Sequence, residues 1–160
     1  MNKGIIIGIV VGVVVVGAAA FLAIPQAPQA PQARTINLEA REFSFKGLGF
    51  DKVACDPGTA CGPKIQVKAG ETVRVVLKNI GGADHEFMVT HESALQEKAA
   101  MHDPVFKEAM SETTKPGQIS TITFLAEKAG KYVYGCFLDV ATKPDRHADR
   151  GMWGEFIVEA

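Results

Sequence analysis

Tryptophan, tyrosine and cysteine are scarce in this chain of 160 residues, which has one tryptophan, two tyrosines and three cysteines. Neither sign of charge dominates, because 17 basic residues nearly balance 18 acidic ones and leave a net charge of −1. A balanced chain of this kind lacks the basic surface that binding to nucleic acid requires, so we expect no nucleic-acid partner. No block of like charge indicates a charged tail either.

Charge and polarity are missing altogether from residues 4–24, which follow a short start containing Lys3. As a helix rising ~1.5 Å per residue, this stretch would span roughly 30 Å, the thickness of a bilayer core. The basic start predicts a single-pass anchor in the cell membrane, with the rest of the chain on the extracytoplasmic (periplasmic or extracellular) side. A cleaved signal peptide is the alternative interpretation.

A spacer and one domain follow this apolar stretch. Residues 25–33 repeat Pro-Gln-Ala three times, and proline at every third position favours a stiff, extended polyproline segment. The remaining residues, 34–160, are enough for one domain with a single hydrophobic core. The sequence therefore divides into an anchor or signal at 1–24, a linker at 25–33 and a domain at 34–160.

The domain has the pattern of short β-strands. Apolar and polar residues alternate, as at Val73, Val75 and Leu77, and a period of two is typical of a strand with one buried face. We expect strands at residues 36–40, 65–67, 73–77, 85–89, 119–126, 131–137 and 153–158. Many short strands in one domain predict an all-β sandwich.

Two local irregularities interrupt this pattern. The alternation changes phase near Arg41, which predicts a β-bulge. Between residues 93 and 110 the apolar spacing becomes helical, and Ser93 and the Asp103-Pro104 pair are typical of helix starts. We therefore expect a short helical insertion, of one or two helices, between the strands.

The three cysteines are Cys55, Cys61 and Cys136. Cys55 and Cys61 flank a turn-forming Asp-Pro-Gly sequence, which predicts a disulfide between them, with a second metal site as the alternative. Cys136 is then left without a partner. An exported free thiol is prone to oxidation unless something holds it, and a metal ion would do so.

Further candidate metal ligands lie close to Cys136 in the sequence. His147 and Met152 follow it in the loop before the last expected strand, and His85 starts an earlier strand after a Gly-Gly break. Two imidazoles and a thiolate in a plane, with a weak axial thioether, form the ligand set of a blue-copper site. We expect copper at His85, Cys136, His147 and Met152, with His91 as a competitor for the upstream histidine.

Four stretches carry a resemblance to a known family. Residues 67–79 read Val-Lys-Ala-Gly-Glu-Thr-Val-Arg-Val-Val-Leu-Lys-Asn, 85–89 read His-Glu-Phe-Met-Val, 130–136 read Gly-Lys-Tyr-Val-Tyr-Gly-Cys, and 147–154 read His-Ala-Asp-Arg-Gly-Met-Trp-Gly. These resemble the cupredoxins, the type 1 blue copper proteins, especially those of the rusticyanin and sulfocyanin kind. The resemblance implies a Greek-key β-sandwich, one mononuclear type 1 copper ion and one-electron transfer.

The resemblance also implies a docking surface, and this sequence departs from the family pattern in one place. In the family the second histidine lies in an apolar patch that contacts redox partners, and the matching residues here are Phe137, Leu138 and Ala148. The family usually separates the cysteine and this histidine by two to four residues, whereas ten residues lie between Cys136 and His147. We expect this longer loop to bulge outward and to alter the docking face.

The functional expectation is an electron carrier rather than an enzyme. Its partners would be redox proteins such as respiratory complexes and copper or haem proteins. It would also contact the membrane through residues 4–24. A copper-binding or copper-delivery protein is the second hypothesis. A copper enzyme is the third, and it would need another copper centre or an open coordination position.

Overall fold

The computed structural model describes residues 32–42, 44–47, 59–97, 103–140 and 145–160. They form eight strands and two short 3₁₀-helices, so the expectation of an all-β fold is confirmed. In this part of the chain no helix is long and apolar enough to span a bilayer. The predicted anchor at 4–24 and Cys55 both lie outside the described residues.

One four-stranded sheet has the order β2-β1-β4-β6. Its strands are β1 (Arg34–Arg41), β2 (Ser44–Gly47), β4 (Glu71–Asn79) and β6 (Ile119–Ala126). β1 runs parallel to β4, whereas β2 and β6 are antiparallel to their neighbours. A parallel pair cannot be joined by a tight hairpin, so the chain leaves this sheet between β2 and β4.

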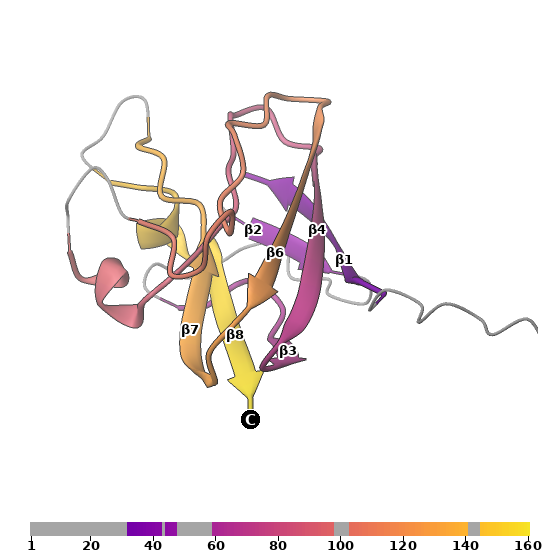
Figure 1. The fold of residues 1–160 in the computed structure, drawn as a ribbon. Coiled ribbons are helices and arrows are strands. Elements are labelled where there is room, and N and C mark those ends of the chain that lie inside the picture. The colour runs from indigo at the N-terminus through magenta and orange to yellow at the C-terminus, as the bar shows by residue number, and fades with distance from the viewer. Residues whose placement is uncertain (1–31, 43, 48–58, 98–102, 141–144) are drawn as a thin grey trace, which may run out of the picture.

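The second sheet has the order β3-β8-β7-β5. Its strands are β3 (Ile65–Lys68), β8 (Trp153–Glu159), β7 (Gly130–Gly135) and β5 (Met88–Thr90). β3 is parallel to β8, and the other two pairs are antiparallel. Figure 1 shows the two sheets as the layers of a sandwich, and the chain passes from the second sheet to the first between β3 and β4.

The core lies between the sheets and follows the alternation seen in the sequence. Val73, Val75 and Leu77 of β4 are buried, and the residues between them are exposed or partly exposed. The facing sheet contributes Tyr134, whose ring stacks on Phe87 at a centroid distance of 5.3 Å. Each large apolar side chain buried here stabilises the fold by about 1.5–3 kcal/mol relative to exposure.

Two local predictions are wrong. The phase change near Arg41 is a hairpin and not a bulge, because β1 and β2 pair with Arg41 opposite Ser44. The helix expected from Asp103-Pro104 does not form either. Residues 104–111 instead run beside β5, where main-chain bonds join Val105 N to Val89 O and Val89 N to Ala109 O, at 2.9 Å each. Backbone pairing with a strand has overridden the local helical signals.

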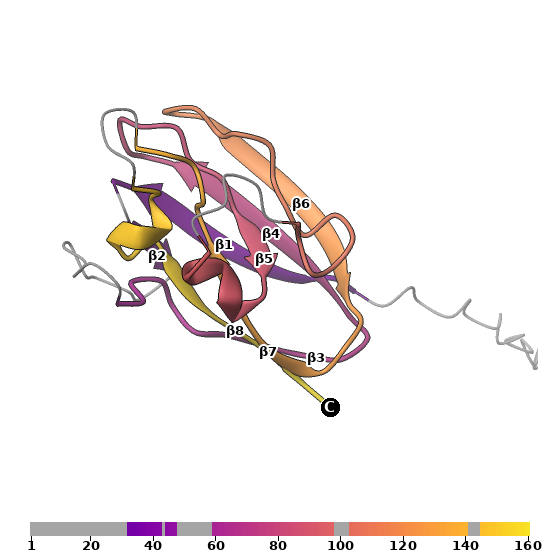
Figure 2. The ribbon, with the colours of Figure 1, turned by 90° about the vertical axis from the view of Figure 1, so that its left-hand side faces the viewer.

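The two 3₁₀-helices lie at the same end of the sandwich. They are η1 (Glu92–Leu95) and η2 (Ala148–Arg150). Figures 1 and 2 show both near the end of the sandwich where β7 finishes and β8 begins, away from the C-terminus. This end contains the residues that the sequence selects as metal ligands.

Candidate metal centre

Cys136 directly follows β7, and its main chain is fixed on both sides. Its N–H donates to Met152 O at 3.0 Å, and its carbonyl accepts from Ala148 N at 2.8 Å. The side chain is completely buried, and its sulfur accepts a hydrogen bond from Glu86 N at 3.4 Å. A hydrogen bond of this kind stabilises negative charge on sulfur and tunes the redox potential of a thiolate-bound metal.

His85 reaches the same place from the edge of the second sheet, where β5 pairs with β7. It lies in the segment before β5 and forms a bridge with Thr114, with N–H···O distances of 3.1 and 2.6 Å in the two directions. Thr114 in turn accepts a hydrogen bond from the buried side chain of Asn79 at 2.8 Å. Asn79 also donates to Ala83 O and accepts from Gly81 N. One amide therefore fixes both the turn before His85 and the segment beside it.

The described ends of the ten-residue loop between Cys136 and His147 pair with each other and bring His147 back to Cys136. Val140 N donates to Asp145 O at 2.8 Å, and His147 N donates to Leu138 O at 2.9 Å. Asp139 and Arg146 form an antiparallel bridge between these two bonds. The insertion thus leaves the site as a paired stem, so the residues at its base stay neighbours. The expected outward bulge stays a prediction, because residues 141–144 lie outside the described residues.

The donor atoms of three predicted ligands converge on one point. His85 Nδ1 lies 3.2 Å from His147 Nδ1, and Cys136 Sγ lies 4.0 Å from the first and 3.3 Å from the second. The centre of this triangle is about 2.1 Å from each donor, which matches the ~2.0–2.3 Å bonds of metals to imidazole and thiolate. The residues present therefore fit a trigonal two-histidine, one-thiolate metal site, and among the described residues no other such group is found.

The environment keeps these ligands uncharged in the absence of metal. Burial raises the pKa of the Cys136 thiol to about 12. Burial, followed by the neighbouring His147, lowers the pKa of His85 to about 4. Burial and then the charge of Arg150 lower the pKa of His147. At neutral pH both imidazoles are ready to coordinate, whereas the thiol must first lose its proton.

The fourth predicted ligand, Met152, lies at the same end of the fold. Its side chain is completely buried. Its carbonyl accepts from Cys136 N, and its own N–H donates to His147 O at 3.1 Å. Met152 therefore adjoins two of the three converging ligands through its main chain. Axial coordination by its sulfur stays a prediction.

Other predicted residues have varied outcomes. Phe137 and Ala148 are buried in a cluster with Met88 and Ala94, and Leu138 is only partly exposed, so the expected apolar docking patch is largely internal. The physical reason is η1, which contributes Ala94 and Leu95 to that cluster. His91 is exposed, its ring lies tilted beside that of Tyr132, and it is not among the converging ligands. The Cys55–Cys61 disulfide stays a prediction, since Cys55 is outside the described residues.

The structure also reveals contributors that sequence reasoning missed. The buried Glu86 accepts a hydrogen bond from Phe137 N at 3.1 Å through its carboxylate, which ties the histidine segment to the cysteine segment. Burial raises the pKa of this carboxyl group. Asn79 and Arg146 are buried as well. Each of the three has at least one partner that is 35 to 52 residues distant, and no local pattern could have identified those contacts.

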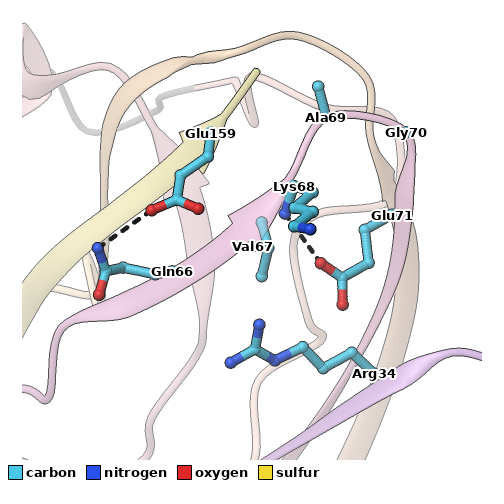
Figure 3. Close-up of a pocket in the computed structure, with 8 residues that line it drawn as sticks. All are labelled: Arg34, Gln66, Val67, Lys68, Ala69, Gly70, Glu71 and Glu159. Atoms are coloured by element: carbon cyan, nitrogen blue, oxygen red, sulfur yellow. Dashed lines mark hydrogen bonds between the residues drawn. The ribbon is translucent and has the colours of Figure 1, made fainter.

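One hollow on the surface of the described residues, of about 670 Å³, is unrelated to this chemistry. It lies at the other end of β8, beside Glu159 (Figure 3). Its lining is Arg34, Gln66, Val67, Lys68, Ala69, Gly70, Glu71 and Glu159. No histidine or cysteine is included. Its polar contacts join Lys68 N to Glu71 Oε2 at 2.8 Å and Gln66 Nε2 to Glu159 Oε1 at 3.5 Å (Figure 3).

Comparison with known proteins agrees with this site. Residues 39–160 match the family model described as multicopper oxidase. The copper-resistant cuproprotein CopI of Rubrivivax gelatinosus is 30% identical over 112 residues, which cover 68% of this chain and 61% of that protein's length. The chain thus spans about three fifths of the curated relative that it matches.

Several solved structures share the fold. Reduced auracyanin from Roseiflexus castenholzii has a TM-score of 0.55 at 23% identity, covering 81% of this chain and 100% of that one. Reduced rusticyanin has a TM-score of 0.53 at 20% identity, covering 78% of this chain and 76% of that one. The blue copper oxidase of Nitrosomonas europaea has a TM-score of 0.54 at 25% identity, covering 80% of this chain and 39% of that larger one.

Copper binding should release about one proton per ion at pH 7, because the Cys136 thiol is protonated in the metal-free protein and both histidines are neutral. The apparent affinity should then rise about tenfold per pH unit. Titration calorimetry in buffers of different protonation enthalpy measures the release. Cys136→Ser, whose hydroxyl keeps its proton, should release close to none. If the wild type releases none either, the thiol is already ionised without metal.

Asn79→Ala should destabilise the domain by about 2–4 kcal/mol, since it removes three hydrogen bonds of a buried side chain, two of them to partly buried main-chain groups of Gly81 and Ala83. Asn37→Ala, at an exposed position of β1, is the matched control and should change stability by less than about 0.5 kcal/mol. Urea unfolding of both variants provides the comparison. Equal losses in the two variants would show that Asn79 has no special role.

Proposed function

This chain belongs to the multicopper oxidase family of cupredoxin domains, and on that premise we propose that it carries single electrons between redox proteins. The observation that supports this function best is the convergence of His85 Nδ1, His147 Nδ1 and Cys136 Sγ within 4.0 Å of one another. Cys136 supplies the thiolate and the two histidines supply neutral imidazoles. A copper ion bound there would supply a one-electron couple between Cu(II) and Cu(I).

The surrounding residues favour electron transfer with little rearrangement. His85 and His147 are held by main-chain bonds to Thr114 and Leu138, and Cys136 is held on both sides. These bonds belong to the fold and do not depend on the charge of the site. A ligand set fixed in this way keeps its geometry when the charge changes, and water is excluded because the ligands are buried.

His147 is the best exit for the electron. His85, Cys136 and Met152 have no exposed surface, whereas His147 is 4% exposed. A partner that docks over η2 would therefore meet this imidazole before any other ligand. We propose redox proteins, such as respiratory complexes or copper or haem proteins, as partners at this face.

Met152 is proposed as the weak axial ligand. The support for this role is its burial and its main-chain bonds to Cys136 and His147. A thioether is a soft donor that favours the reduced ion and so raises the reduction potential.

The apolar segment 4–24 supports a further proposal on location. We propose that it anchors the chain in the cell membrane and that the linker at 25–33 holds the domain on the extracytoplasmic side. A buried free thiol that is protected by copper suits an oxidising compartment.

A copper-handling role is the second candidate, because the curated relative is a copper-resistant cuproprotein. In this role the same ligands would hold copper and limit its free concentration. A catalytic role is a third possibility, favoured by the likeness to a blue copper oxidase at 25% identity. The carrier function predicts no turnover of oxygen or nitrite.

Loading residues 34–160 with Cu(II) should give an intense visible thiolate-to-copper band and a type 1 EPR signal, because the thiolate is strongly covalent with Cu(II). Cys136→Ser should lose the band while the fold remains, as measured by circular dichroism. A colourless wild-type protein with an ordinary tetragonal EPR signal would contradict the proposed site.

A second measurement on the same loaded protein separates the three candidates. Stopped-flow mixing with a reduced haem protein measures the rate of electron transfer. A Cu(I) chelator measures the rate of copper loss, and an electrode measures the consumption of oxygen or nitrite. A carrier should accept the electron reversibly, keep its copper and consume neither substrate. Loss of copper before the electron arrives would favour copper handling, and steady substrate consumption would favour an enzyme.

A further inference from the structure

Arg146 is a buried cation that the proposed function does not use. It directly precedes His147 and ends the ten-residue insertion, and its side chain is only 4% exposed. A buried guanidinium is costly unless its donors are paired and its charge is balanced. Its partners therefore indicate what holds it in place.

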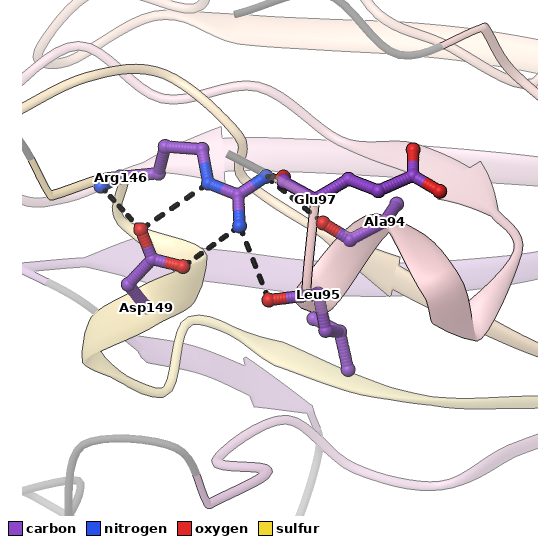
Figure 4. Close-up of polar contacts among 5 residues, drawn as sticks. All are labelled: Ala94, Leu95, Glu97, Arg146 and Asp149. Atoms are coloured by element: carbon purple, nitrogen blue, oxygen red, sulfur yellow. Dashed lines mark hydrogen bonds and ion pairs between the residues drawn. The ribbon is translucent and has the colours of Figure 1, made fainter. Parts of the chain in front are cut away.

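All five N–H donors of this guanidinium have partners (Figure 4). Nη1 donates to Ala94 O at 2.9 Å and to Glu97 O at 2.7 Å, and Nη2 donates to Leu95 O at 3.2 Å. Nε and Nη2 also reach the two carboxylate oxygens of Asp149, at 3.2 and 2.8 Å. The fork shape of arginine suits this double task, and lysine has too few donors for it.

The first set of partners is the end of η1. This 3₁₀-helix has no side-chain cap at its start, and helices leave their last carbonyls without partners. Arg146 satisfies three carbonyls at or just after this end. It therefore attaches η1 to a segment about 50 residues further along the chain.

The second partner, Asp149, closes a short turn that contains the His147 ligand. The carboxylate of Asp149 also accepts from Arg146 N at 2.8 Å, so that it binds both the main chain and the side chain of Arg146. His147 and Ala148 lie between these two residues in the sequence. The turn that presents the His147 imidazole is thus closed by its own flanking residues and fastened to η1.

The Arg146 guanidinium also packs against an apolar side chain next to the site. The guanidinium carbon lies 5.5 Å from the centre of the Phe137 ring, over its face. Phe137 follows Cys136, and Ala148 follows His147, and both are buried in the cluster to which η1 contributes Ala94. Arg146 thereby contacts the residue that follows Cys136, and it is itself the residue that precedes His147.

We propose that Arg146, together with Asp149 and the end of η1, is a positioning device that sets the orientation of the His147 ligand. The device adds to the main-chain pairing at the base of the ten-residue loop, because ordering a longer loop costs more conformational entropy. Its importance for copper rests on the proposed function, whereas its effect on the turn does not need metal.

The test compares Arg146→Lys and Asp149→Asn with Arg74→Lys, an equivalent change at an exposed position of β4. Amide hydrogen exchange of the metal-free proteins should show protection at residues 147–152 reduced about tenfold or more in the first two variants, while β4 and β6 keep theirs. Arg74→Lys should match the wild type everywhere. With copper, the first two variants should show altered EPR hyperfine splitting and faster copper release.

Two results would overturn the proposal. One is unchanged exchange at residues 147–152 in both variants. The other is a uniform increase across all strands in both, which would mean that Arg146 only adds global stability. Because exchange is measured without metal, a wild-type protein that lacks a type 1 spectrum would contradict the proposed function and leave this test intact.

Discussion

Two main-chain hydrogen bonds at Cys136 hold the ligand loop together. Cys136 N donates to Met152 O, and Ala148 N donates to Cys136 O, so the start and the end of the loop are tied to one residue. The antiparallel pair β7 and β8 places these groups opposite each other, with Gly135 facing Trp153. The ligand set therefore depends on the register of this pair. A slip of one residue would turn the Cys136 side chain to the other face of the sheet.

Burial gives the site its chemical character. The imidazoles and the thiol lie in the interior, where charge is unfavourable, and this keeps the metal-free ligands neutral. A metal ion would reverse that preference at the thiol, since its charge stabilises the thiolate. The polar groups that hold the ligands are themselves satisfied inside the fold: Asn79 by main-chain groups, and Arg146 by carbonyls and a carboxylate. The site is thus a small polar network inside an apolar sandwich.

Much of this arrangement could be predicted from the sequence. Alternation at Val73, Val75 and Leu77 predicts a strand because burial on one face is a local, periodic property. Cys136 and His147 could be identified as candidate metal ligands because cysteine and histidine are few in this chain and chemically distinctive. One lies at the end of a strand and the other at the end of a loop. The helix expected at Asp103 is wrong because pairing with β5 outweighs local propensity. Arg146 and Glu86 could not be assigned roles, since their partners come from distant segments that only the fold brings together.

The central claim is that His85, Cys136 and His147 form a rigid, preorganised copper site. X-ray absorption at the copper edge, recorded on the loaded protein in both oxidation states, tests it most directly. The claim predicts one short copper–sulfur distance and two copper–nitrogen distances that hardly change on reduction. Loss of a nitrogen ligand on reduction, or the absence of a sulfur ligand in the oxidised protein, would contradict it.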